Sequence, residues 1–250
     1  MTQYPDVAFA KYGESGAYHW REIGGGLISH NAFTAERYRR VIDALGPLAG
    51  RRILDYGCGD GAFLGFLARR AGRAVGALHG FDPTPAALAL AAPLLKERRV
   101  DVTLHATLDD VPESFFDRVA CTEVIEHVSD PEGLLREIVR VLKPGGEVVL
   151  TTPIRMTDQP ADPNHVHEWF AREFAALVGA QPLQILRHDE IIPAAAPEVY
   201  FWRPPVFARV PVFRLLCNTL SICAGVNASS LLHVRPCLFM VQLLVARKPA

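Results

Sequence analysis

Acidic and imidazole side chains occur in two short segments of this chain, at spacings that can bring them together. Glu123, Glu126 and His127 form an E-x-x-E-H pattern, and His165 follows in a second histidine-rich segment. If a helical turn runs through the first segment, its three side chains share one face, because residues three and four apart are neighbours on a helix. Two carboxylates and two imidazoles suit a divalent ion, Mg²⁺ or Mn²⁺. Two further readings stay open: a histidine acting as a base without a metal, and a purely structural role.

A glycine-rich loop lies upstream of these segments. Gly57, Gly59 and Gly61 stand at every second position after the run Ile53–Tyr56, and a helical apolar pattern follows. This order predicts a buried strand, a tight turn and the start of a helix. Glycine suits such a turn because it adopts backbone angles that a Cβ forbids and lets a ligand approach the main chain. We therefore expect the loop to hold a nucleotide-like cofactor against a helix N-terminus.

The details of the loop narrow the choice of cofactor. Its spacing is G-x-G-x-G, whereas dinucleotide-binding loops have G-x-G-x-x-G. Asp55 stands two residues before the first glycine, and its carboxylate would repel a pyrophosphate. The same carboxylate suits a cofactor that carries an ammonium group and a sulfonium.

Strand-like and helix-like segments alternate along the first three quarters of the chain. This alternation predicts an α/β fold with a parallel sheet and helices on both faces. Ligands of such sheets bind at the carboxyl ends of the strands, which is where the glycine loop lies. The expected strands are 51–55, 75–81, 100–105, 117–121, 146–151, 183–187 and 238–246, and the expected helices are 34–46, 60–71, 85–96, 131–142 and 169–178.

Two segments outside this pattern also stand out. The strongly apolar segment 211–226 follows a proline-broken stretch and places Arg214, Asn218 and Ser221 on one narrow helical face. It is expected to face the core or a second subunit; a lid over a lipophilic substrate and a membrane-contact helix are the alternatives. Near the N-terminus, the glycine-flanked aromatic residues at 18–20 either close over the cofactor or simply pack.

The glycine loop resembles that of the class I S-adenosylmethionine-dependent methyltransferases, and four more segments extend the resemblance over about residues 50–190. They are 80–82, 107–112, 116–128 and 142–153. The resemblance implies a Rossmann-like doubly wound sheet, mostly parallel with an antiparallel last strand. It also implies that Asp82 accepts hydrogen bonds from the ribose. An acidic residue often lies beside the adenine in this family, and Thr107 stands at that position here.

The E-x-x-E-H segment looks like that of the ubiquinone-biosynthesis O-methyltransferases. It is also similar to that of the small-RNA 2′-O-methyltransferases, in which a later histidine four residues before a tryptophan completes a metal site. His165 and Trp169 have that spacing. The resemblance therefore implies catalytic roles for His127 and His165, and a metal site formed by Glu123, Glu126, His127 and His165 or no metal at all. The implied cofactor-binding residues are Asp55, Tyr56, Gly57, Cys58, Gly59, Asp82, Pro83, Thr107, Leu108, Thr122 and Glu123.

Composition limits the classes of partner and compartment. The 250 residues carry a formal net charge of −1, so no global field attracts nucleic acid. Five cysteines form no C-x-x-C pair, which favours a reducing compartment. The N-terminal residues are too polar for a signal peptide, and no apolar run reaches the roughly 18 residues of a transmembrane helix. We expect a cytoplasmic location.

Together these features predict one α/β domain. Residues 1–48 form an N-terminal helical cap, 49–190 the S-adenosylmethionine-binding core, and 191–250 a substrate-side insertion with the last strand. The expected activity is O-methylation of a small metabolite, sugar or lipid-like precursor. A divalent-metal-dependent RNA 2′-O-methyltransferase and a non-catalytic S-adenosylmethionine-binding module are the alternatives, and a homodimer is possible.

Overall fold

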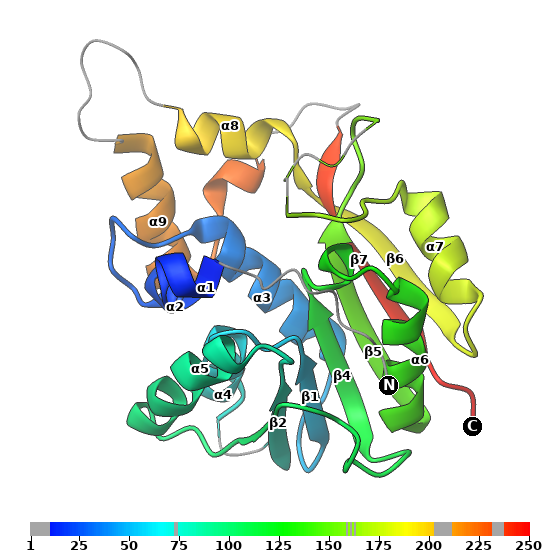
Figure 1. Cartoon of the computed structure of the whole chain (residues 1–250). Coiled ribbons are helices and arrows are strands. Elements are labelled where there is room, and N and C mark those ends of the chain that lie inside the picture. The colour runs from blue at the N-terminus through cyan, green and yellow to red at the C-terminus, as the bar shows by residue number, and fades with distance from the viewer. Residues whose placement is uncertain are drawn as a thin grey trace.

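A seven-stranded sheet forms the centre of the protein in the computed structural model (Figure 1). The structure describes residues 11–72, 75–158, 160, 162, 164–202, 212–231 and 238–250. The strand order is β3-β2-β1-β4-β5-β7-β6. The strands are β1 (Arg52–Tyr56), β2 (Ala77–Phe81), β3 (Thr103–His105), β4 (Phe116–Thr122), β5 (Leu142–Pro153), β6 (Gln184–Pro193) and β7 (Phe239–Arg247).

The order reverses beside β1, because the chain moves outward to β2 and β3 and then returns to β4 on the other side of β1. The pairs from β3 to β5 are parallel, and β7 is antiparallel to both of its neighbours. The expected mostly parallel sheet with an antiparallel last strand is therefore confirmed. Such a reversal point leaves a crevice at the carboxyl ends of the strands, which is the usual ligand site of these sheets.

Helices cover both faces of the sheet, and each face has its own apolar core. On one face pack α3 (Ala32–Leu45), α4 (Ala62–Ala71) and α5 (Pro85–Glu97). On the other pack α6 (Pro131–Val141) and α7 (Ala171–Gly179). Local sequence fixes where helices begin: Asn31 accepts hydrogen bonds from the first amides of α3, and Asp130 accepts one from Gly133 before α6.

The remaining α-helices and one short 3₁₀ turn gather with α3 at one end of the molecule, at the upper left of Figure 1. They are α1 (Lys11–Ser15), α2 (Tyr18–Ile23), α8 (Ala195–Phe201), α9 (Val212–Ala224) and the short 3₁₀ turn η3 (Ala228–Leu231). None of the helices in the described ranges combines the length and apolar character that crossing a bilayer requires.

Most expected elements occur within a few residues of their predicted bounds, with two differences. The strand predicted at 183–187 continues to Pro193 as β6, because its second half pairs with β7. Helix α8 forms inside the stretch that its prolines mark as broken, and its Pro197 lies in the first turn, where a missing N–H costs nothing. Residues 203–211 of that stretch lie outside the described residues. The boundaries predicted at 48 and 190 stay predictions.

Candidate active site

A cavity of about 420 Å³ opens at the carboxyl ends of β1, β2 and β4. Ligand sites of small molecules fall in this range of size. Of the residues expected to bind a cofactor, the cavity is lined by Asp55, Tyr56, Gly57, Cys58, Asp82, Pro83, Thr122 and Glu123. The structure therefore brings together side chains from three strand ends that lie up to 68 positions apart in the sequence.

The glycine loop takes the conformation that its sequence predicts. Gly57 has a φ of +80°, and a Cβ at this position would collide with the side chain of Val124. The amides of Gly57 and Cys58 donate to the carbonyl of Phe81 at 2.7 and 2.8 Å, which ties the loop to the end of β2. Any side chain at position 57 would thus disturb the wall of the cavity.

Asp55 is a buried carboxylate at the end of β1, with 2% of its surface exposed. Its Oδ2 atom has no hydrogen-bond partner among the described residues. Burial, together with the nearby carboxylates of Asp82 and Asp60, raises the pKa of Asp55 well above its ordinary value. An unpartnered buried carboxylate is costly, so this position fits a ligand that brings a positive charge or a donor.

Asp82 follows β2 and holds the glycine loop in place through a hydrogen bond. Its carboxylate accepts hydrogen bonds from the amides of Gly59 and Thr84, each at 2.9 Å. Burial raises the pKa of Asp82, although these amide bonds oppose the shift. Each carboxylate oxygen can accept more than one hydrogen bond, so the residue still has capacity for a ligand hydroxyl.

Arg37 reaches the cavity from the middle of α3. Its guanidinium lies 3.4 Å from the carboxylate of Glu123, and its Nε atom has no partner among the described residues. Burial alone would lower the pKa of Arg37, but the carboxylates of Glu123, Glu22 and Glu126 outweigh it and raise the pKa. A guanidinium is the side chain best suited to hold a planar carboxylate.

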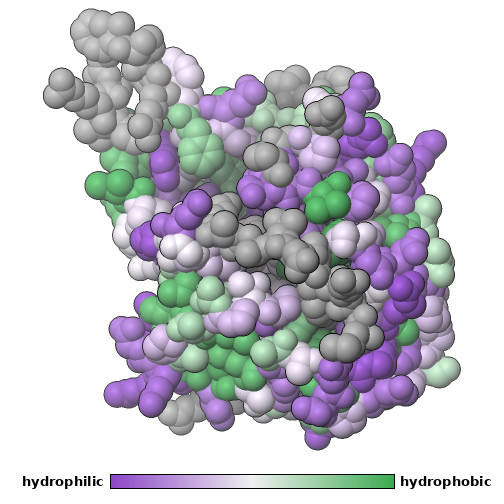
Figure 2. All heavy atoms as spheres, viewed as in Figure 1, coloured by the Kyte–Doolittle hydropathy of each residue, from purple (hydrophilic) through white to green (hydrophobic). Residues whose placement is uncertain are grey.

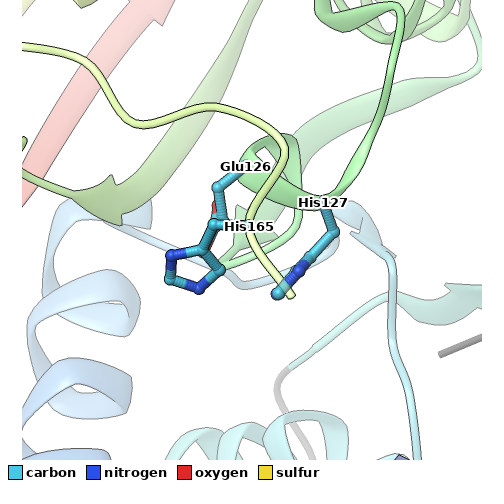
Figure 3. A group of neighbouring side chains, drawn as sticks. All are labelled: Glu126, His127 and His165. Atoms are coloured by element: carbon cyan, nitrogen blue, oxygen red, sulfur yellow. The ribbon is translucent and has the colours of Figure 1, made fainter. Parts of the chain in front are cut away.

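His127 and His165 project into the same space from two different segments (Figure 3). Their ring centroids are 4.9 Å apart. His165 lies on a loop that docks on the turn around Glu126, because the amides of Val166 and His167 donate to the Glu126 carbonyl. These two backbone hydrogen bonds bring together histidines that are 38 positions apart in the sequence.

The partners of the two rings fix their tautomers. Nδ1 of His127 lies 2.9 Å from the carbonyl of Asn164, and Nδ1 of His165 lies 2.6 Å from the carboxylate of Glu168. Both partners can only accept, so each neutral ring carries its proton on Nδ1 and keeps a lone pair on Nε2. Burial lowers the pKa of His127, although the bond to Asn164 opposes this shift. The arrangement fits a base or a metal ligand.

Glu126 completes a group with these histidines, and the three ligand atoms lie within 4.8 Å of one another. It is fully buried; one carboxylate oxygen accepts from the Thr152 hydroxyl at 3.0 Å, and Oε1 has no partner within the described ranges. Burial and the nearby Glu123 carboxylate raise the pKa of Glu126 well above its ordinary value. A bound proton or cation would offset the cost of burying this carboxylate.

The structure separates Glu123 from that group. The 3₁₀ turn η2 (Ile125–His127) begins only after it, and Glu123 itself has a φ of +54°. The helical turn expected through all three residues of the E-x-x-E-H pattern does not form, and Glu123 faces Arg37 instead. Glu123 lines the cavity, but its electrostatic partner is Arg37.

Three other expected cofactor residues do not line the cavity. Leu108 is buried in the apolar core, and Thr107 is exposed, with its hydroxyl accepting from the Asp109 amide. Gly59 is tied to Asp82, and a Cβ on it would collide with the ring of Tyr12. The adenine contacts of Thr107 and Leu108 and the cofactor contact of Gly59 stay predictions.

Aromatic residues of the N-terminal segment form one side of the cavity. Tyr18 and His19 line the cavity, and their rings pack against each other at a tilt of 36°, with centroids 3.9 Å apart. Trp20 is buried and donates from Nε1 to the Asp60 carbonyl at 2.6 Å. Trp20 therefore packs, while Tyr18 and His19 face the cavity, and closure of this segment over a cofactor stays a prediction.

Several residues of the site have no clear signal in the sequence. Arg37 lies in an amphipathic helix where nothing distinguishes it from a surface arginine, and Tyr12 belongs to a short helix without periodicity. Glu168 carries a weak signal, because an acid three residues after a histidine can meet it on a turn.

Comparisons with known proteins agree with this site. A family model described as a methyltransferase domain matches residues 30–189. The ubiquinone biosynthesis O-methyltransferase of Alkalilimnicola ehrlichii is 35% identical over 151 residues, which are 59% of this chain and 59% of that protein. The chain thus covers less than two thirds of that relative's length.

Solved structures with under 25% identity share the fold. The geranyl diphosphate C-methyltransferase of Streptomyces coelicolor A3(2), solved with Mg²⁺, geranyl diphosphate and S-adenosyl-L-homocysteine, is 18% identical with a TM-score of 0.62. The match covers 86% of this chain and 77% of that one. The [4+2]-cyclase SpnF is 22% identical with a TM-score of 0.59, covering 87% and 82%.

Since a cyclase shares this fold, the fold alone does not fix a reaction. The family match is more specific, because it spans the glycine loop, both acidic strand ends and the two histidines of the cavity. The chain belongs to the methyltransferase-domain family, as a class I S-adenosylmethionine-dependent methyltransferase.

Proposed function

We propose that this protein transfers a methyl group from S-adenosylmethionine to a hydroxyl of a small metabolite, sugar or lipid-like precursor. One observation carries the proposal: a single cavity holds Asp55, whose Oδ2 has no partner among the described residues, and the two imidazoles of His127 and His165. The first suits the cationic donor, and the others suit removal of a hydroxyl proton. The name of the ubiquinone biosynthesis relative supports an oxygen acceptor.

Residues at two strand ends and in α3 would hold the donor. Asp55 would bind its ammonium group, Asp82 its ribose hydroxyls, and Arg37 its carboxylate. Each assignment rests on a polar atom that has spare capacity, namely Asp55 Oδ2, the Asp82 oxygens and Arg37 Nε. The bound donor supplies an electrophilic methyl on a sulfonium, so placement of the acceptor accounts for most of the remaining rate.

His165 is the better candidate for the base. Its Nδ1–H is held by the Glu168 carboxylate at 2.6 Å, which keeps Nε2 free to accept the acceptor's proton and stabilises the imidazolium that forms. His127 is held by a neutral carbonyl, and burial lowers its pKa. We therefore assign proton removal to His165, with Glu168 as its positioning residue, and assign orientation of the hydroxyl to His127.

Isotope-labelled donor tests the proposal. The protein would be incubated with a panel of phenols, sugars and short single-stranded RNAs, and label in the acceptor would be measured. We expect transfer to a small hydroxyl compound and a fall of about 10²–10⁴-fold in His165→Ala, the range of general-base catalysis. Donor binding with wild-type turnover in a His127→Ala/His165→Ala variant would contradict the assignment of the base.

A second candidate adds a divalent cation to the same reaction. Glu126, His127 and His165 each offer one ligand atom, and these atoms lie within 4.8 Å of one another. The buried Oε1 of Glu126, which has no partner in the described part of the chain, fits a cation. Two imidazoles with one carboxylate favour transition metals over Mg²⁺, so Mn²⁺ is the better choice of the two. The ion would acidify the acceptor hydroxyl. Loss of activity in chelator with rescue by Mn²⁺ tests it, and unchanged activity after exhaustive chelation would exclude it.

Methylation of RNA and binding of the donor without turnover each give a distinct readout in the same assay. An RNA 2′-O-methyltransferase would methylate the single-stranded RNA of the panel, with binding that weakens steeply as salt rises. A non-catalytic module would bind the donor without any transfer. The net charge of −1 does not favour RNA, and the ordered histidine pair does not favour the non-catalytic module. A homodimer and a cytoplasmic location stay predictions.

A further inference from the structure

The lining of the cavity carries more acidic than basic side chains. Arg37 is the single lysine or arginine among the described residues that line it, whereas six residues there are acidic. The surplus belongs to the cavity rather than to the protein as a whole, because the chain has a formal net charge of only −1. Figure 2 accordingly shows hydrophilic residues spread among hydrophobic ones over the visible face. The acidic lining residues are Glu22, Asp55, Asp82, Glu123, Glu126 and Asp162.

The donor accounts for only part of this surplus. In the proposed function Asp55 receives its ammonium group and Arg37 receives its carboxylate. Burial lowers the pKa of Arg37, but the carboxylates of Glu123, Glu22 and Glu126 outweigh burial and raise it, so one guanidinium already serves three acidic residues. A bound donor makes its own carboxylate compete for that guanidinium and adds a single sulfonium. The three glutamates therefore still outnumber the cations near them.

Glu126 shows that the described part of the protein does not meet this surplus. Its side chain is fully buried, one oxygen accepts from the Thr152 hydroxyl at 3.0 Å, and Oε1 has no hydrogen-bond partner among the described residues. A buried carboxylate oxygen without a donor is costly. Because Glu126 lines the cavity beside His127 and His165 (Figure 3), a cationic ligand group would offset this cost close to the place where the acceptor hydroxyl must lie.

Aromatic rings line the same cavity. Tyr12 comes from α1, and Tyr18 and His19 come from α2. The ring centroids of Tyr12 and Tyr18 are 5.8 Å apart, and those of Tyr18 and His19 are 3.9 Å apart. The faces of aromatic rings attract ammonium groups, and the attraction is larger where water is excluded. Rings and carboxylates together are therefore suitable surroundings for an organic cation.

Asp162 connects this aromatic wall with the two histidines. Burial raises the pKa of the Tyr18 hydroxyl, and the carboxylate of Asp162 is among the groups that raise it further. Burial lowers the pKa of His127, and the same carboxylate is among the groups that oppose that shift. The carbonyl of Asp162 also accepts from the His165 amide at 3.0 Å. One molecule with a hydroxyl at the histidines can therefore place a second group between acids and rings.

We propose that the acceptor is a small hydroxyl compound that also carries an ammonium group, as in amino alcohols, amino sugars and arylalkylamines. The ammonium lies among Glu22, Glu126, Asp162 and the ring of Tyr18. The inference rests on the proposed function, because it narrows the acceptor of that reaction. The transfer breaks the bond between sulfur and the methyl group, forms a carbon–oxygen bond and moves the hydroxyl proton to His165. An acidic acceptor would meet the same carboxylates and be repelled.

Acceptors that differ in charge test the inference. Glucosamine, glucose and glucuronate form one series, and dopamine, ethylcatechol and dihydrocaffeate form another; both join the panel of phenols and sugars. We would measure kcat/KM with labelled donor, with and without chelator, and locate the methyl group by mass spectrometry. Calorimetric titration into protein saturated with S-adenosyl-L-homocysteine gives acceptor affinity without turnover. The variants are Asp162→Asn and Glu22→Gln. Asp158→Asn is the matched control, because Asp158 is exposed on the same loop and does not line the cavity.

We expect the cationic member of a series to bind and react at least about tenfold better than the neutral one, and the anionic member to be the poorest. This preference should fall about threefold or more in Asp162→Asn and Glu22→Gln and be unchanged in the control. Transfer to neutral or anionic acceptors with equal or higher kcat/KM would overturn the inference and leave the proposed function standing. Dependence on Mn²⁺ with a neutral acceptor preferred would assign the surplus charge to the ion and overturn it as well. Absence of transfer to any oxygen in the panel would overturn the proposed function itself.

Discussion

Replacement of Asp55 by asparagine has opposite expected effects on the empty protein and on donor binding. The two side chains have nearly the same shape, so the change removes a charge and little else. In the empty protein, Asp55 Oδ2 is buried without a partner in the part of the chain that the structure describes. The variant should therefore be more stable without the donor and weaker in binding it.

Typical energies of buried polar groups and of charged hydrogen bonds give the magnitudes. Replacing this buried carboxylate by an amide should raise the free energy of unfolding by about 1 kcal/mol, after subtraction of the cost of burying the amide. In a domain of this size such a gain raises Tm by about 2–4 °C. A hydrogen bond to a charged group is worth about 1.5–3 kcal/mol, so affinity for S-adenosylmethionine should fall about 10- to 150-fold.

The pH dependence has a definite sign. Burial raises the pKa of Asp55 above its value in the unfolded chain, so the folded state binds the proton more tightly. Wild-type stability therefore falls as pH rises from about 4 towards the folded pKa, and the variant lacks this loss. The ammonium of the donor favours the ionised form, so wild-type donor affinity should rise with pH over the same window.

Calorimetric titration of the donor and thermal melts across pH 4–8 measure both effects. Asp117→Asn is the control, because Asp117 lies outside the cavity and accepts from the Arg52 amide and Lys143. It should lower Tm and leave donor affinity unchanged. A variant of Asp55 that melts lower than wild type and binds the donor equally well would refute the reasoning.

Three further predictions concern residues around the cavity. Glu168→Gln should lower kcat about tenfold or more with little change in KM, because His165 loses the carboxylate that stabilises its charged form. Steady-state kinetics test this, and an increase in KM as large as the fall in kcat would point to a structural role. Arg37→Gln should weaken donor binding at least about tenfold in calorimetry, and unchanged affinity would remove Arg37 from the donor site. Gly57→Ala should lower Tm by several degrees, since position 57 has a φ of +80° and its Cβ meets Val124; an unchanged melt would contradict the strain.

The cofactor half of the site could be predicted because its signals are local. Asp55 and the three glycines lie within seven residues, and their types report the backbone angles and charge of one strand-to-helix turn. Asp82 follows from the same logic at the end of the next strand. One local prediction was wrong. The spacing of the E-x-x-E-H pattern predicted that its three side chains share one helical face, but Glu123 has a left-handed backbone conformation and lies outside the helical turn.

The sequence by itself determined the alternation of strands and helices, the glycine turn and the acids at two strand ends, because each depends on neighbouring residues. Only the tertiary structure decided that Arg37 meets Glu123 and that His165 meets His127, since these contacts join distant segments. It also decided which side of α9 faces inward. A helical pattern shows that two faces differ, but only the partner groups of the folded protein, here the carbonyls of Leu27 and His30 that accept from Asn218, determine which face is buried.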